Sequence, residues 1–153
     1  MCHTFEMDHS LLKTALHTAN YQMTKAFEGL SEEQGDFDIR ICQEARTARE
    51  ILEHLCDCYQ GYMELSHGKQ YAWGSFKAEG YTVSKLLDVR NELRQKAESF
   101  ALAHANDPKS AEFALGFLVL HETYHVGQMC LLHIKVDPNW NPYSIYEGYE
   151  DWS

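Results

Sequence analysis

The sequence predicts an all-α fold, a four-helix bundle whose helices run up-down-up-down, and two observations support this prediction. Helix breakers are rare, with nine Gly and three Pro in 153 residues. Between them lie four segments of about 20 residues in which apolar residues recur every three or four positions, the period of a helix that buries one face. Four such helices pack naturally as one bundle. We therefore expect a single domain over residues 1–153, long enough to bury a core.

Breaker and capping residues set the expected limits of the four helices. Gly29 ends the first helix, Asn106-Asp107-Pro108 stops the third, and Ser110 is a good N-cap for the fourth. The expected helices cover about 9–29, a second from a start between 43 and 47 to about 66, a third from 82 or 84 to 105, and a fourth from just after Ser110 to about 135.

Two segments outside these helices are rich in aromatic residues. The loop His67–Tyr81 holds three Gly and four aromatic residues, and it either covers a pocket or is a surface loop anchored to the bundle. The tail Val136–Ser153 holds five aromatic residues, two Pro and no Lys or Arg. Such a tail is too aromatic to be disordered, so we expect it to dock as a subunit interface, a pocket rim or a core cover.

Charge and composition exclude several classes of function. The formal net charge is −10, and no basic patch or Lys/Arg-rich helix is visible, so nucleic acid is not an expected partner. The longest apolar run, Phe113–Leu120, is far shorter than the roughly 20 residues that span a membrane. The N-terminal MCHTFEMDHS does not read as a signal peptide, and the five cysteines form no paired framework. We therefore expect a cytoplasmic protein with free thiols and no membrane partner.

The fourth predicted helix carries two histidines inside the apolar stretch FALGFLVLHETYHVGQMCLL. His121 and His125 lie one turn apart on the same face, with Gln128 on the same stripe. Burying an imidazole among Phe and Leu side chains costs a few kcal/mol unless its nitrogens find partners. A metal ion would satisfy both rings, because histidines at i and i+4 converge on one cation. The alternative is two core histidines bonded to neighbouring polar groups.

The second predicted helix places a third histidine within reach of the same region. His54 lies to one side of the apolar stripe formed by residues such as Ile51 and Leu55, on the flank that faces a neighbouring helix. Glu50 and Asp57 are a turn away or less, so either is expected to bond the second ring nitrogen of His54.

The residues HETYH also match HExxH, the zinc-peptidase motif in which the glutamate, here Glu122, is the general base. The longer peptidase pattern requires Gly at position 128 and His at 131, where this chain has Gln128 and Leu131. A related pattern would use Glu147 as third ligand, but this residue lies in the aromatic tail rather than on a helix. No strand is predicted to hold a peptide beside the site. The peptidase is therefore the weaker interpretation.

The chain resembles the DinB-like, or YfiT-like, superfamily of metalloenzymes. Its members are four-helix bundles with a histidine on the second helix, here within ARTAREILEHL, and an HxxxHxGQ-type motif on the fourth, here HETYHVGQ. LLKTALHTANYQMTKAFEGLSEEQ is similar to the first helix and turn of the family, so the resemblance covers nearly the whole chain as one DinB-like domain. It implies that His54, His121 and His125 bind one divalent metal ion, which is zinc, nickel or iron in such proteins.

Three neutral imidazoles leave coordination positions open for water or substrate, which is typical of catalytic sites. Cys58, one turn beyond His54, is an alternative ligand, although a buried free Cys is commoner. Gln128 is a candidate for orienting a ligand or a bound water. Glu122 points about 100° around the helix from His121, so it fits an interhelical role better than that of a base. These two are the weak catalytic candidates of the chain.

The resemblance further implies a metal-dependent enzyme, a thiol S-transferase ahead of a hydrolase. A low-molecular-weight thiol would be its co-substrate, with a small-molecule substrate and a homodimeric assembly. The competing hypothesis is a non-catalytic protein whose metal merely fastens the bundle, which predicts a closed coordination sphere and a large loss of stability on chelation.

Overall fold

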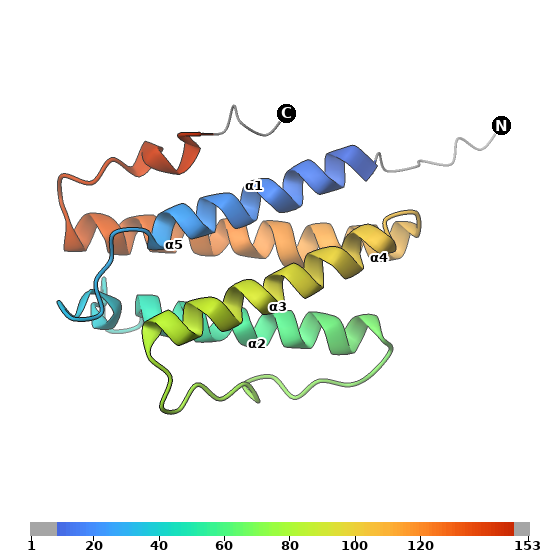
Figure 1. Cartoon of the computed structure of the whole chain (residues 1–153), viewed down its shortest axis with the longest axis horizontal. Coiled ribbons are helices and arrows are strands. Elements are labelled where there is room, and N and C mark those ends of the chain that lie inside the picture. Colours follow the sequence, from blue (N-terminus) through green and yellow to red (C-terminus); the bar gives the residue numbers. More distant parts are fainter. Residues whose placement is uncertain (1–8, 149–153) are drawn as a thin grey trace.

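Four long helices form the protein, whose computed structural model describes residues 9–148 (Figure 1). They are α1 (His9–Phe27), α2 (Ala48–Ser66), α3 (Val83–Ala103) and a continuous fourth helix made of α4 (Pro108–Ala114), the π-helical segment η2 (Leu115–Leu120) and α5 (His121–Val136). Two short 3₁₀ helices, η1 (Asp36–Asp38) and η3 (Pro142–Tyr146), lie in the connections. Residues 9–148 contain no strand. The predicted all-α four-helix bundle is confirmed.

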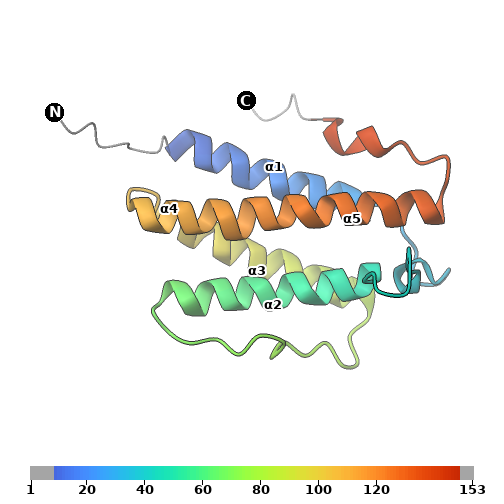
Figure 2. The ribbon, with the colours of Figure 1, turned by 180° about the vertical axis from the view of Figure 1, so that it is seen from behind.

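The directions of the helices differ from the predicted up-down-up-down order. Near the start of α2, Arg49 donates to the carbonyl of Tyr81, just before α3, over 3.1 Å. Near the ends of the same two helices, the rings of Tyr62 and Phe100 lie 6.4 Å apart. α2 and α3 therefore run the same way, and the order is up, down, down, up, as Figures 1 and 2 show.

The long connection between α2 and α3 makes this parallel arrangement possible. α2 has 19 residues and rises about 1.5 Å per residue, whereas an extended chain covers about 3.3 Å per residue. The loop that follows α2 is therefore long enough to return along the whole outer side of the helix before α3 begins (Figure 1). A short turn would have forced the antiparallel order that we predicted.

Local side-chain caps explain where two of the helices begin. Thr47 and Glu50 form a capping box at the start of α2, in which each side chain accepts from the backbone N–H of the other. The fourth helix begins at Pro108 rather than after Ser110 as predicted. Asp107 is its N-cap, since its carboxylate accepts from the Ser110 backbone N–H over 2.8 Å and from the Ser110 hydroxyl over 2.7 Å.

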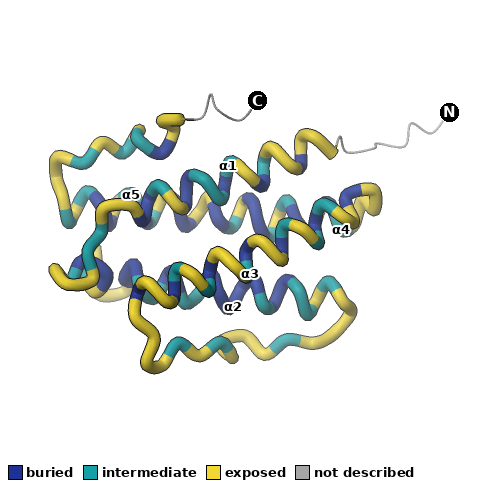
Figure 3. Tube along the Cα trace, viewed as in Figure 1, coloured by how far each residue is buried: buried dark blue, intermediate teal, exposed yellow. Residues whose placement is uncertain are grey.

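The inner faces of the helices form a single apolar core (Figure 3). Each helix contributes fully buried side chains to it, among them Leu12, Leu16 and Met23 of α1, Ile51, Leu52 and Leu55 of α2, Leu86 of α3, Leu118 of η2 and Met129 of α5. Within residues 9–148 no helix combines the length and the apolar character needed to cross a membrane.

The described part of the aromatic tail docks on the bundle, as predicted. The indole of Trp140 stacks on the His133 ring with a centroid distance of 4.1 Å, and Ile145 is buried against the core. This part of the tail therefore covers the core beside α1 and α5 (Figure 1). The last residues of the predicted segment, 149–153, lie outside the described part of the chain.

Candidate metal centre

The structure brings the three histidines predicted from the sequence together between α2 and α5. The Nε2 atom of His121 lies 3.2 Å from Nε2 of His54 and 3.0 Å from Nε2 of His125. One nitrogen of each ring lies within 4.8 Å of the other two. In a tetrahedral zinc site with bonds of 2.0–2.1 Å, neighbouring ligand nitrogens are about 3.3 Å apart. The donor set therefore fits a single divalent ion.

The fourth helix changes its winding directly before this cluster. The π-helical segment η2 ends at Leu120, and His121 is the first residue of α5. Single π-helical turns are frequent at functional sites because the wider turn changes which side chains share a face. Phe117, in that segment, stacks against His121 with a centroid distance of 5.8 Å and so supports the ring.

Burial keeps the three rings in the neutral form that binds metal. The pKa of His54 is lowered from 6.5 to about 4, first by desolvation and then by the nearby charge of Arg46. Desolvation also lowers the pKa of His125 to about 4 and lowers the pKa of His121. Neutral imidazole is the ligand form, so no proton must be removed from these rings before a cation binds at neutral pH.

Gln128 is hydrogen-bonded to the ring of His125. The Oε1 atom of Gln128 lies 2.7 Å from Nδ1 of His125 and can only accept a hydrogen bond, so Nδ1 carries the proton. The lone pair of Nε2 then points toward the other two histidines. The amide nitrogen of Gln128 in turn donates to the hydroxyl of Tyr124 over 3.0 Å. Gln128 therefore contacts one of the three histidines, at a place from which it can orient that ring, and its role stays a prediction.

The two carboxylates expected to bond His54 are used elsewhere, which corrects that prediction. Glu50 pairs with Arg40 and completes the capping box of α2. Asp57 anchors the loop that returns along α2, and its carboxylate accepts from the Tyr71 hydroxyl (2.8 Å) and from the backbone N–H groups of Gly74 (2.8 Å) and Phe76 (3.0 Å). Sequence spacing placed both acids near His54 but could not show that other donors are nearer to them.

Cys58 lies beside the cluster but is not part of it. Its Sγ atom is 3.5 Å from Nε2 of His54, and the side chain is buried. Burial raises the pKa of the Cys58 thiol to about 12, so the sulfur is protonated at neutral pH. Since the converging set contains His54 and not Cys58, the histidine keeps the position for which the sequence left the cysteine as an alternative.

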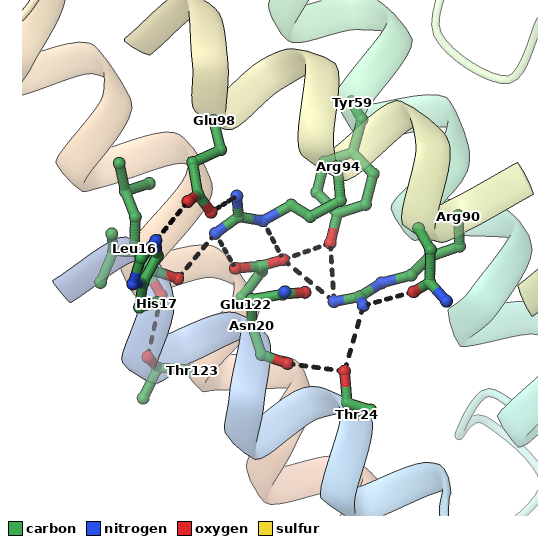
Figure 4. Close-up of polar contacts among 12 residues, drawn as sticks. Leu16, His17, Asn20, Thr24, Tyr59, Arg90, Arg94, Glu98, Glu122 and Thr123 are labelled. Atoms are coloured by element: carbon green, nitrogen blue, oxygen red, sulfur yellow. Dashed lines mark hydrogen bonds and ion pairs between the residues drawn. The ribbon is translucent and has the colours of Figure 1, made fainter. Parts of the chain in front are cut away.

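Glu122 has the interhelical role favoured from the sequence (Figure 4). It is fully buried and accepts from Nε and Nη2 of Arg94 over 2.7 and 3.0 Å. It also accepts from Arg90 over 3.3 Å and from the hydroxyl of Tyr59. Both carboxylate oxygens are therefore occupied in the core by residues of α2 and α3.

This arrangement removes the support for a zinc peptidase. Glu122 would have to face the metal and a water molecule as general base, yet it binds two buried arginines of α3. Glu147, the third ligand of that hypothesis, does not belong to the converging set. Throughout residues 9–148 there is also no strand beside the helix that could hold a peptide.

Hollows adjoin the cluster on its outer side. A hollow of about 330 Å³ is bounded by all three histidines together with Glu44, Ala45, Arg46, Tyr124 and Gln128. His54 also borders a hollow of about 950 Å³ between α2 and the loop that carries Trp73 and Phe76. The loop therefore does both things that the sequence left open, since it is anchored to the bundle and lines a hollow.

Two residues of this site were not singled out from the sequence. Arg46 directly precedes the N-cap Thr47 and lines both hollows, while Tyr124 accepts from Gln128 at the edge of the smaller one. The only signal for Arg46 is its position eight residues before His54, just ahead of the helix that carries this histidine.

Comparisons with known protein families, with curated proteins and with solved structures find no match for this chain. The assignment of a function therefore depends on the chemistry of the site itself.

Proposed function

We propose that this protein is a metal-dependent enzyme of the DinB-like type that transfers a low-molecular-weight thiol to a small electrophilic substrate. The observation that carries the proposal is the convergence of His54, His121 and His125 beside hollows that a small molecule can enter. Three neutral nitrogen ligands and an adjoining cavity are the features of catalytic rather than structural metal sites.

His54, His121 and His125 would hold the ion, which would lower the pKa of a bound thiol and so supply a thiolate nucleophile near neutral pH. In the transfer, the sulfur uses a lone pair to form a bond to the electrophilic carbon of the substrate. The leaving group departs with the electrons of its former bond, and the thiol proton passes to solvent. The products are a thioether, the leaving-group anion and a proton, so the reaction needs no oxidant or reductant.

The residues of the chain contribute position and charge to this reaction. Gln128 keeps the lone pair of His125 directed at the ligand cluster. Tyr124 accepts from Gln128, so its own O–H remains available to donate to a ligand in the smaller hollow. Trp73 and Phe76 give the larger hollow an aromatic wall suited to an apolar electrophile.

The hollows favour a transferase or hydrolase over a metal that only fastens the bundle. A purely structural site would fill its fourth position with a protein ligand, and the nearest sulfur, Cys58, lies outside the converging set. A hydrolase needs a general base beside the attacking water, and Glu122, the base of the HExxH motif, is occupied in the core. Thiol transfer needs no such base.

Two further proposals concern the compartment and the oligomeric state of the protein. We propose that it acts in the reducing cytoplasm, where thiols are abundant, and that it forms a homodimer. The four cysteines within residues 9–148 are free, which agrees with a reducing compartment. Sedimentation at micromolar concentration tests the dimer.

The test of the proposed function is thiol conjugation by protein loaded with zinc, nickel or iron(II). Mercaptoacetate and monochlorobimane are the probes, and the fluorescence of the conjugate reports the rate. We expect saturable acceleration that His121→Ala abolishes while the variant stays folded. Acceleration that survives in His121→Ala, or none with any of the three metals, would refute thiol transfer at this site.

A further inference from the structure

Arg46 differs from the other arginines of the chain in having no partner. The chain has five arginines, all within the described residues, and Arg40, Arg49, Arg90 and Arg94 each form an ion pair and a hydrogen bond. Over residues 9–148, no hydrogen bond or ion pair joins Arg46 to any group, and its side chain is exposed. Its guanidinium therefore presents its donors to solvent or to a ligand.

Arg46 lies beside the histidine cluster, so its unpaired charge is available to a ligand there. It borders the 330 Å³ hollow that holds all three histidines and also the 950 Å³ hollow beside His54. The same charge is among the causes that lower the pKa of all three histidines, which agrees with its place at the mouth of the cluster. A ligand that occupies either hollow beside the histidines therefore lies near this side chain.

A guanidinium is planar and presents paired N–H donors that match the two oxygens of a carboxylate. We propose that Arg46 is the anion subsite of this pocket and that the thiol co-substrate carries a carboxylate, which Arg46 binds while the sulfur faces the three histidines. This inference rests on the proposed function, because it names the chemical class of the thiol that the site takes.

Neighbouring charges limit the size of the effect. Glu44 lines the smaller hollow, and no ion pair within residues 9–148 joins a carboxylate of either hollow to Arg46. The larger hollow is lined by four carboxylates and one further cation: Glu50, Glu53, Asp57, Glu79 and Lys77. The negative charges of these carboxylates weaken the field that an incoming carboxylate meets, and solvent screens the exposed guanidinium. We therefore expect a gain in affinity of about fivefold, less than the roughly tenfold or more that a hydrogen bond to a charged group typically gives.

The test uses the cobalt(II)-loaded protein, whose near-ultraviolet absorption reports a sulfur ligand directly. Mercaptoacetate and mercaptoethanol are titrated separately, because they have the same carbon chain and differ in the carboxylate. The comparison is made in the unaltered protein, in Arg46→Gln, and in Arg49→Gln as a control that removes the same charge one turn further along α2, away from the hollows.

We expect Arg46→Gln to raise the Kd for mercaptoacetate about fivefold while the Kd for mercaptoethanol and the cobalt content stay unchanged. Arg49→Gln should leave both constants as they are. Equal changes for the two thiols in Arg46→Gln, or no change for either, would overturn the anion subsite and leave the proposed function standing. Absence of the sulfur absorption with both thiols in the unaltered protein would instead refute thiol binding at the metal, and this inference with it.

Discussion

Replacing Glu122 by Gln is expected to destabilise the protein strongly while leaving the metal site in place. Glu122 is fully buried and is the carboxylate that faces both Arg90 and Arg94, whose side chains are at most 2% exposed. The variant keeps the shape of the side chain but removes the charge that compensates two buried guanidinium groups, so that Arg94 retains only Glu98 and Arg90 retains no carboxylate partner among residues 9–148. Removing one partner of a buried ion pair typically costs about 3–5 kcal/mol. This is a large share of the roughly 5–15 kcal/mol by which domains are stable.

The assay is urea unfolding followed by circular dichroism, with the free energy of unfolding obtained by linear extrapolation. Glu98→Gln is the matched control, because Glu98 also pairs with Arg94 over 2.9 Å but is 17% exposed. We expect it to cost about 1 kcal/mol. A loss for Glu122→Gln no larger than that of the control would refute the role assigned to the buried network. Folded Glu122→Gln protein should still bind metal, whereas a variant that keeps its stability and loses only hydrolytic activity would revive Glu122 as a base.

Three other predictions address the surroundings of the site. Gln128→Leu removes the acceptor of the His125 Nδ1 proton and should weaken metal binding about 10- to 100-fold in competition with a chelating dye, whereas equal affinity would exclude the orienting role. In metal-free protein, the pKa of His125 falls from 6.5 to about 4 on folding, so its contribution to stability is complete above about pH 6.5 and is lost as the pH drops toward 4. Urea unfolding at several pH values should show this loss of stability. The same loss in a His125→Gln variant would contradict its assignment to His125. Gly61→Ala would place a methyl carbon 2.5 Å from the ring of Trp73. We therefore expect loop 67–81 to move away from α2 and to be cleaved faster in limited proteolysis. An unchanged cleavage pattern would show that the loop accommodates the methyl group in place.

The fold class was predictable because apolar periodicity is a local property of the chain. Four segments with a helical period and few breakers gave the number of helices and nearly all their limits. The order of directions was not predictable in this way, because periodicity does not say whether a loop turns back at once or returns along the helix. The start of the fourth helix was missed for a smaller reason, since Asp107 and Ser110 are both good N-caps and only the structure shows which one accepts the hydrogen bonds.

The three histidines of the site were also predictable, since burying imidazoles on apolar helix faces requires a shared partner. What the sequence could not show is how the neighbouring charges are distributed. Asp57 accepts hydrogen bonds from backbone N–H groups of the loop and therefore does not bond the ring of His54. Arg90 and Arg94 fall on the buried stripe of α3, which the sequence pattern contains. The sequence could not show that their partner is Glu122 on another helix.

The three-histidine metal site is tested by the metal content of purified protein, measured by elemental analysis, with thermal stability followed on chelation. The unaltered chain is compared with His54→Ala and with His104→Ala, which removes an exposed histidine of similar size away from the cluster. We predict about one divalent ion per chain in the unaltered protein and in His104→Ala, its loss in His54→Ala, and a modest drop in stability on chelation. Undiminished metal in His54→Ala, or no metal in the unaltered protein after exposure to zinc, nickel and iron(II), would contradict the three-histidine site.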